Sequence, residues 1–301
     1  MKKSYFSSTY KNPNNLKNSL IFIKEFKQNL IRSLEEELNL LYVDTPRLTK
    51  LSNNSNLRNI NFDNKSNNLI YEFIYFPCKF LNKILDQLDV NDNIYGLISN
   101  YERYNRDSIV SSTEFMAQNV IDIRIKTIED SFEEVCKQFY SKIISIMTKV
   151  ANSIENKYSD LVINKDSLSE NYNIQNMNSF FKIYQTLKID DYIQQKVIDN
   201  QHVLFTNTKK SKTNLFFRIS DYDHDVENGQ LLYYYPVSHQ LLNLMQVALS
   251  KGEDNNYLHI TININLIIMT LLGKYHIAEV MPGSWDQSFE KEANKKRVEI
   301  L

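Results

Sequence analysis

Hydrophobic side chains recur at intervals of three and four residues in two long segments of the chain. In the first segment, 18–39, Phe26, Leu30 and Leu34 are separated by lysine, glutamate and other polar residues. The second segment, 128–158, repeats this spacing with phenylalanine, isoleucine and valine. Such spacing places the apolar side chains on one face of an α-helix, so both segments are predicted to be amphipathic helices that cover a core.

Short apolar runs bounded by polar residues predict the strands of a sheet. These runs lie at 40–43, 69–76, 95–101, 114–125, 202–205, 215–219, 231–235 and 257–265. The run 69–76 is apolar and aromatic apart from one glutamate, which favours a buried strand. Strands 95–101 and 114–125 are expected to pair antiparallel, with the polar segment 102–113 connecting them.

Shorter helices are predicted at 78–88, 181–199, 238–249 and 266–272. Segment 52–68 contains eight asparagines in seventeen positions and is predicted to be a loop. Neither an internal repeat nor a Pro/Gly linker divides the chain. We therefore expect one α+β domain over 18–290, built on an antiparallel sheet flanked by helices, with a disordered tail at 1–17 and a C-terminal tail at 291–301.

Composition limits the class of protein. The 301 residues are 42% hydrophobic, enough to bury a substantial core. The 35 basic and 36 acidic residues give a net charge of −1, so no overall field favours nucleic acid or an anionic membrane. The apolar runs fall short of the roughly 20 residues that span a bilayer. Two cysteines far apart, Cys78 and Cys136, are typical of a reducing compartment, which predicts a cytoplasmic protein.

Glycine is scarce. The chain has five glycines in 301 residues, far below the average use of about 7%. Backbone that wraps closely around phosphate groups usually relies on glycine, because a residue without Cβ permits close approach and positive φ. The five histidines also lack the close spacing to cysteine or aspartate that metal sites use, so no metal site is predicted.

Three short motifs follow one another in the last third of the chain. They are Arg-Ile-Ser-Asp-Tyr-Asp at 218–223, Asn-Gly-Gln-Leu-Leu at 228–232 with Pro236, and His-Ile-x-x-Val-x-x-Gly-x-Trp at 276–285. In their residues and in their order, these motifs resemble those of the ammonia-dependent asparagine synthetases, which are relatives of the class II aminoacyl-tRNA synthetases. The resemblance extends at low identity from the first helix to Trp285.

This resemblance implies a class II synthetase-like antiparallel sheet flanked by helices, and a reaction that needs ATP and magnesium. In that reaction the side-chain carboxylate of aspartate attacks the α-phosphate of ATP, giving an aspartyl-adenylate and pyrophosphate, and ammonia then displaces AMP. Aspartate or asparagine is the ligand it implies. The resemblance also implies a homodimer, with the interface at helix 18–39 and the region of Pro46.

The residues that the resemblance assigns to the amino-acid side of the site are largely kept. Arg218 and Asp223 match the arginine and the last aspartate of the first motif, which help to hold the aspartate substrate. Gln118 matches a substrate-contacting glutamine, although the carboxylate expected two positions later is Val120. Lys79 is the one lysine kept from a Ser-x-x-Lys-x-Lys motif.

The nucleotide side departs from the pattern. The arginine that opens the helix after the last strand is replaced by Leu266, which offers neither charge nor donor. Thr261 and Asn263 stand where a glycine-rich strand is expected. The phosphate-contacting arginine between the two central strands aligns with Glu102, and Arg103 or Arg106 could replace it only if the connection shifts.

The expected magnesium-binding glutamate and a further arginine are replaced by Asn243 and Ser250. Loss of one transition-state donor commonly costs 10²–10³ in rate. The sequence therefore predicts either an aspartate–ammonia ligase that uses Arg103 or Arg106, or a non-catalytic paralogue that keeps the fold and an amino-acid pocket as a regulatory or scaffold subunit. The number of losses favours impaired or absent activity. An RNA-binding module, suggested by basic residues at 209–212 and 291–297, is the least favoured alternative.

Overall fold

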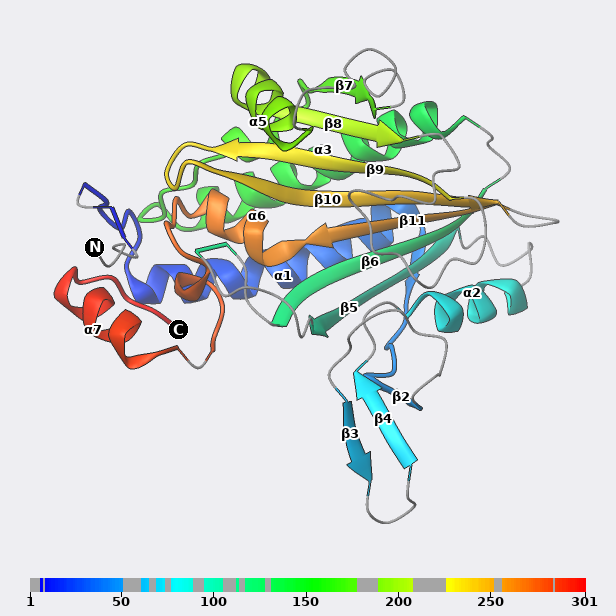
Figure 1. Cartoon of the computed structure of the whole chain (residues 1–301), viewed down its shortest axis with the longest axis horizontal. Helices are drawn as coiled ribbons and strands as arrows, with labels where there is room; N and C mark the ends of the chain where they lie inside the picture. The colour runs from blue at the N-terminus through cyan, green and yellow to red at the C-terminus, as the bar shows by residue number, and fades with distance from the viewer. Residues whose placement is uncertain are drawn as a thin grey trace.

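The computed structural model of the chain describes residues 6–7, 9–50, 61–64, 69–73, 77–88, 95–104, 112–113, 117–127, 131–177, 189–207, 226–251, 256–283 and 285–301. Among these residues, eight strands form one sheet in the order β1-β5-β6-β11-β10-β9-β8-β7 (Figure 1). Their bounds are β1 Leu40–Tyr42, β5 Gly96–Tyr104, β6 Ala117–Thr127, β7 Asn173–Asn176, β8 His202–Asn207, β9 Val226–Tyr235, β10 Gln240–Lys251 and β11 Asn256–Asn263.

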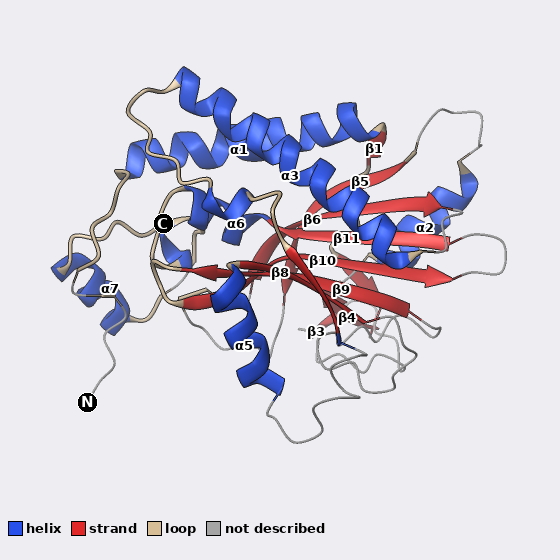
Figure 2. Cartoon of the chain, turned by 90° about the horizontal axis from the view of Figure 1, so that it is seen from above, coloured by secondary structure: helices blue, strands red, loops and turns tan. Residues whose placement is uncertain are grey.

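The sheet is antiparallel from β5 to β8, and only the edge pairs β1–β5 and β7–β8 are parallel. Helices cover both of its faces (Figure 2). On one face lie α1 (Leu16–Leu38), α3 (Phe132–Lys157) and α6 (Ile264–Leu271), and on the other lies α5 (Ile189–Asn200). Helix α2 (Cys78–Gln87) packs on this second face through Leu81 and Leu85, which contact Leu97 of β5. The predicted α+β class, an antiparallel sheet flanked by helices, is confirmed.

The principal core lies between the sheet and α1, α3 and α6. Phe22, Phe26, Leu30 and Leu34 form one stripe of α1 and are 0% exposed, as the three- and four-residue spacing predicts. Asn15 begins the helix by accepting a hydrogen bond from the backbone N–H of Asn18 at 2.9 Å. No helix among the described residues is long and apolar enough to cross a membrane.

The helix predicted at 238–249 is wrong, because these residues belong to the central strand β10. Leu242, Leu244, Met245 and Val247 are buried, and the strand is covered on both faces. A register shift between Asn243 and Met245 moves the alternation by one residue, and the resulting pattern imitates a helical period.

The run 69–76 does contain a strand, but the prediction that this strand is buried is wrong. A second, three-stranded sheet in the order β2-β4-β3 consists of β2 Leu48–Lys50, β3 Asn61–Asn64 and β4 Leu69–Phe73. It projects from the domain (Figure 1), and Ile70 is 42% exposed. Strand β3 also falls inside the predicted loop 52–68. An aromatic run indicates extended structure, but it does not show which layer of the protein the strand joins.

The two predicted tails, 1–17 and 291–301, also differ from the structure where it describes them. Phe6 is 1% exposed and packs on Phe289 of α7 (Gln287–Lys295), with ring centroids 5.4 Å apart. The backbone N–H of Leu301 donates to the carbonyl of Ala278 at 2.8 Å. These contacts join the two ends of the chain, and a local sequence pattern carries no signal for them.

Candidate functional site

Alternation along the central strands separates two kinds of side chain. On β6, Ile121, Ile123 and Ile125 enter the core under α1 and α3, whereas Asp122 and Arg124 face the opposite side. We call this opposite side of β5, β6, β11, β10 and β9 the polar face. It carries Ser99, Tyr101, Arg103, Gln118, Asp122, Arg124, Asn228, Gln230, Asn243, Gln246, Ser250, His259, Thr261 and Asn263.

Asp122 lies at the centre of the polar face and is 0% exposed. The hydroxyl of Tyr101 donates to its Oδ2 at 2.7 Å, and the hydroxyl of Thr261 donates to its Oδ1 at 2.7 Å. The Nε2 atom of His259 lies 3.0 Å from the same Oδ1. Three strands therefore converge on one buried carboxylate.

The surroundings keep Asp122 ionised and His259 neutral. Burial alone would raise the pKa of Asp122, but the His259 ring and the hydrogen bonds from Tyr101 and Thr261 lower that pKa to about 2. Burial and the nearby charge of Arg124 lower the pKa of His259 below its ordinary value. A neutral His259 still donates from Nε2, so the carboxylate keeps its hydrogen bonds at neutral pH.

Arg103 and Gln118 meet across β5 and β6. They are direct partners in the antiparallel register, and Nη2 of Arg103 donates to Oε1 of Gln118 at 2.9 Å. Strand β5 continues to Tyr104, so Arg103 reaches the polar face with no shift of a loop, contrary to the sequence-based expectation. Glu102 points to the other side, where it interacts electrostatically with Lys27 of α1.

The positions that face the nucleotide in the resemblance are occupied by compact, buried side chains. Leu266 is 5% exposed and belongs to the principal apolar core. Thr261 and Asn263, at the expected glycines, are 4% and 8% exposed. Thr261 bonds to Asp122, and the Oδ1 atom of Asn263 accepts the backbone N–H of Leu266 at 3.3 Å, which begins α6.

The described residues do not fit a magnesium site. Asn243 lies on β10 at the polar face with its Oδ1 buried, so it supplies at most one neutral oxygen. Asp122 is held by three neighbouring side chains. No group of three or more His, Cys, Asp or Glu residues that could hold a metal ion occurs in the part of the chain that the structure describes. The hydroxyl of Ser250 donates to the backbone carbonyl of Tyr257 at 3.3 Å.

Of the predicted site residues, the structure brings together Gln118 and Arg103 and places Asn243 on the same face. Arg218, Asp223 and Arg106 lie outside the described residues. Lys79 lies in α2, which packs at the border of the polar face through Leu81 and Leu85, but its own side chain is not described.

Three polar-face residues escaped sequence analysis: Asp122, Arg124 and His259. Their signal is a period of two, since Asp122 and Arg124 alternate with isoleucines on β6, and His259 and Thr261 alternate with apolar residues on β11. A buried strand that still carries polar residues at every second position indicates a face with its own polar network. The described charges on the strands of this face are those of Arg103, Arg124 and Lys126 against the carboxylate of Asp122, an excess of positive charge that suits an anionic ligand.

No protein-family model matches the chain. In sequence, the chain is similar to an aspartate–ammonia ligase of Clostridium tetani, with 24% identity over 331 aligned positions that cover 97% of this chain and 96% of the relative. This similarity extends over nearly the full length of both chains and confirms the predicted resemblance.

In structure, the chain is similar to an asparaginyl-tRNA synthetase of Entamoeba histolytica in complex with asparaginyl-adenylate, with a TM-score of 0.60 at 10% identity, covering 88% of this chain and 66% of that chain. The corresponding enzyme of Pyrococcus horikoshii, also complexed with asparaginyl-adenylate, gives a TM-score of 0.59 at 7% identity and covers 88% and 68%. The chain spans about two thirds of the length of these synthetases. The likeness confirms the predicted class II synthetase fold.

Proposed function

From the premise that this chain is a diverged member of the ammonia-dependent asparagine synthetases, built on a class II synthetase fold, we propose that it binds aspartate or asparagine on its polar face and has lost most or all of the ATP-dependent amidation of aspartate. The main support is the difference between the amino-acid side and the nucleotide side of the site. Arg103 and Gln118 present polar groups on this face, whereas Leu266 is buried in the apolar core.

The proposed binding of an amino acid rests on the charge and the hydrogen-bond donors of Arg103. A guanidinium offers paired N–H donors to a carboxylate, and each charge-assisted hydrogen bond contributes about 1.5–3 kcal/mol. Arg103 is 7% exposed and is oriented by Gln118, so little rotamer freedom remains for a ligand to remove. Arg218 and Asp223, by resemblance, complete this side.

The nucleotide side lacks the means to neutralise a triphosphate. An apolar side chain at position 266 offers no donor, and buried side chains at 261 and 263 replace residues that would let phosphates approach the backbone. The described residues also do not fit magnesium. We therefore propose that adenylate formation is severely reduced or absent, and that the chain acts as a regulatory or scaffold subunit that senses an amino acid.

An active ligase is the second candidate, and one observation favours it. Arg103 lies on the polar face beside Gln118 without any loop shift, so its guanidinium is one side chain that could contact a phosphate in place of the missing arginine. An active ligase requires that the guanidinium of Arg103 contact a phosphate of the nucleotide instead of the amino acid.

Isothermal titration calorimetry distinguishes the two ligand classes. We expect aspartate or asparagine to bind and ATP·Mg to give no heat of binding. Arg103→Ala should weaken amino-acid binding at least about tenfold, because a charged hydrogen bond is lost. Gln118→Ala should weaken it less, since only the orientation of Arg103 is affected. Arg32→Ala, on an α1 side chain that is 78% exposed, is the charge-matched control. Tight ATP·Mg binding without an amino acid would refute the proposal.

We also propose a homodimer through α1 and the edge strand β1. Leu41 and Tyr42 of the edge strand β1 are 40% and 37% exposed, and Leu20 of α1 is 47% exposed, although all three are large hydrophobic residues. Light scattering at micromolar concentration should give twice the chain mass of 35.6 kDa, and Leu41→Asp should reduce it to one chain. A monomeric wild-type protein would contradict this prediction.

A further inference from the structure

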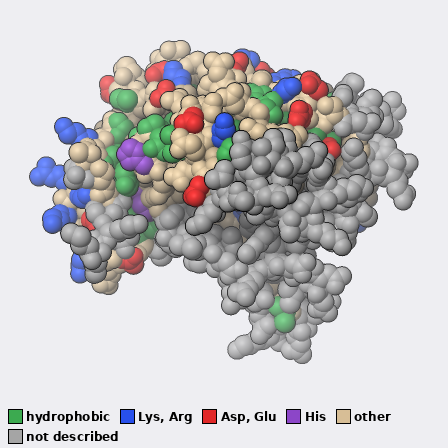
Figure 3. Space-filling model, turned by 45° about the horizontal axis from the view of Figure 1, so that its top comes forward, with side chains coloured by type: hydrophobic (Ala, Val, Ile, Leu, Met, Phe, Trp, Pro, Cys, Tyr) green, Lys and Arg blue, Asp and Glu red, His purple; other side chains and the backbone are tan. Residues whose placement is uncertain are grey.

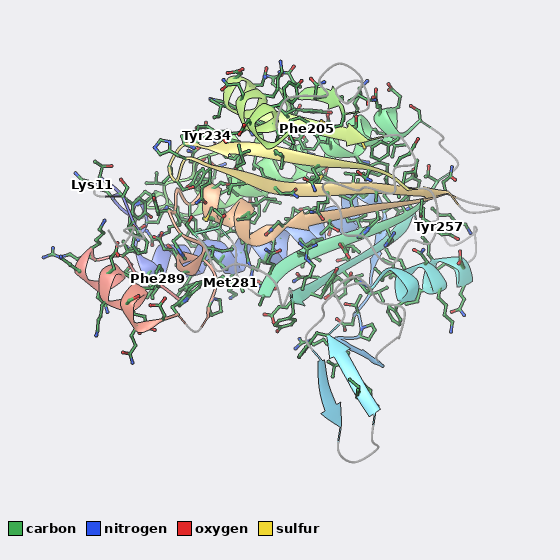
Figure 4. All side chains as sticks on the ribbon, viewed as in Figure 1. Lys11, Phe205, Tyr234, Tyr257, Met281 and Phe289 are labelled. Atoms are coloured by element: carbon green, nitrogen blue, oxygen red, sulfur yellow. The ribbon has the colours of Figure 1, made fainter. Side chains whose placement is uncertain are left out.

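A cavity of about 550 Å³ lies at the end of the domain that carries the N-terminal segment and the β9–β10 turn. Four stretches of chain line it: the segment from Ser7 to Pro13, residues 162–164 after α3, the turn 236–239, and residues 272–273 at the end of α6. None of its lining residues belongs to the polar face. Figure 4 shows Lys11 and Tyr234 at this end of the sheet, and Tyr257 at the far end.

Buried hydrogen bonds hold the walls of the cavity in place. Asn14, which is 1% exposed, donates from Nδ2 to the carbonyl of Val162 at 2.8 Å and accepts the N–H of Val162 at 3.0 Å. The same Nδ2 donates to the carbonyl of Leu272 at 3.2 Å. Lys274, also 1% exposed, donates to the backbone carbonyl of Asn14 at 2.8 Å. Walls fixed in this way form a site that exists before a ligand binds.

The ionisable side chains of the lining are cationic or neutral. Lys11 and His239 are exposed, and neither Asp nor Glu occurs among the residues that line the cavity. Tyr10 also lines it, and its hydroxyl donates to the carboxylate of Glu279 at 2.8 Å; Glu279 itself is 1% exposed and does not line the cavity. Lys and Arg side chains also project from this end of the molecule, beside histidine and hydrophobic side chains (Figure 3).

One ring nitrogen of His239 is hydrogen-bonded to Tyr234. Its Nδ1 atom lies 3.0 Å from the hydroxyl of Tyr234. A tyrosine hydroxyl that donates to Nδ1 leaves the ring proton on Nε2, which can then donate to a ligand. The apolar part of the lining includes Val162, which is 56% exposed, together with Val237 and the buried Leu272.

We propose that this cavity binds a small organic carboxylate. The apolar body of the ligand packs on Val162 and Val237, and its carboxylate is bound by Lys11 and His239. A volume of about 550 Å³ lies within the range of small-molecule sites, roughly 300–1,000 Å³. Because the lining shares no residue with the polar face, this binding is separate from the proposed binding of aspartate.

Ligand-observed NMR and calorimetry with benzoate test the proposal. Benzamide is the control ligand, since it has the same ring without the charge. We expect benzoate to bind at least about tenfold more tightly than benzamide. Lys11→Gln combined with His239→Gln should remove this preference. Lys17→Gln removes the same charge from an exposed residue outside the cavity and should leave benzoate binding as in the wild type.

The outcomes separate this site from the polar face. Benzoate binding that survives Arg103→Ala and an excess of aspartate supports a separate cavity. Equal binding of benzoate and benzamide, or unchanged benzoate binding in the Lys11→Gln/His239→Gln variant, overturns the proposal. Lys11→Gln/His239→Gln and Lys17→Gln change only exposed side chains, so circular dichroism should show the wild-type fold in each.

Discussion

Asp122→Ala is expected to lower the free energy of unfolding by about 3–5 kcal/mol, the usual cost of removing one member of a buried polar network. The reason is that Tyr101, Thr261 and His259 all direct a polar group at this carboxylate. Truncation leaves these groups buried without their acceptor and opens a cavity between three strands. Urea unfolding followed by circular dichroism measures the change.

Asp191→Ala on α5 is the matched control, because Asp191 is exposed, and it should change stability by less than about 0.5 kcal/mol. The pH dependence gives a second check. The folded pKa of about 2 lies below the ordinary 3.8, so the contribution of Asp122 is complete above pH 4 and is lost as pH falls toward 2. A loss below about 1 kcal/mol in Asp122→Ala would show that the network is not a stabilising element.

Glu279→Gln is expected to remove a fall in stability that the wild-type protein shows as pH rises. Glu279 is 1% exposed, and burial raises its pKa from 4.5 to about 7. Its Oε1 accepts the backbone N–H groups of Tyr275 and His276, each at 3.0 Å, and its Oε2 accepts the hydroxyl of Tyr10 at 2.8 Å. The nearby charge of Lys274 and these hydrogen bonds lower its pKa, but burial outweighs them.

The raised pKa of Glu279 determines whether stability rises or falls with pH. The contribution of Glu279 is fully present below pH 4.5 and is lost as pH rises toward 7, by about 3 kcal/mol for a shift of this size. His276 opposes this trend, because burial lowers its pKa to about 4 and stability falls as pH drops below 6.5. The difference between wild type and Glu279→Gln therefore isolates the glutamate.

Chemical unfolding at several pH values between 4.5 and 7.5 measures that difference. Glu290→Gln on α7 serves as the control, since Glu290 is exposed and should leave the wild-type dependence intact. Identical pH dependence in wild type and Glu279→Gln would mean that Glu279 ionises normally, and the proposed cause of the shift would be wrong.

Much of the fold follows from local patterns, and the failures have physical causes. The stripe of Phe26 and Leu30 predicts α1 because its helical period is unbroken. Strand β10 was predicted as a helix because the irregularity after Asn243 breaks its alternation and because both of its faces are buried. Burial of Phe6 against Phe289 escaped prediction, since that contact joins opposite ends of the chain.

The candidate site could likewise be predicted only in part from the sequence. Gln118 and Arg103 could be predicted as candidates from motif order and strand position. The side to which each points depends on where β5 ends, and the structure extends that strand to Tyr104. Asp122 and His259 belong to no motif of the resemblance, and only their alternation with apolar neighbours identifies them. Their partnership across two strands is a property of the sheet register, which no single strand encodes.

The most direct measurement of the central claim is aspartate-dependent exchange between ATP and labelled pyrophosphate on the purified protein. Losing one transition-state donor commonly costs 10²–10³ in rate, and the nucleotide side lacks both the arginine at position 266 and, among the described residues, a magnesium site. We therefore predict no exchange above the blank, under conditions where calorimetry shows that aspartate or asparagine binds. Clear exchange that requires aspartate, and that is abolished by Arg103→Ala, would contradict the account and show that the chain is an active ligase.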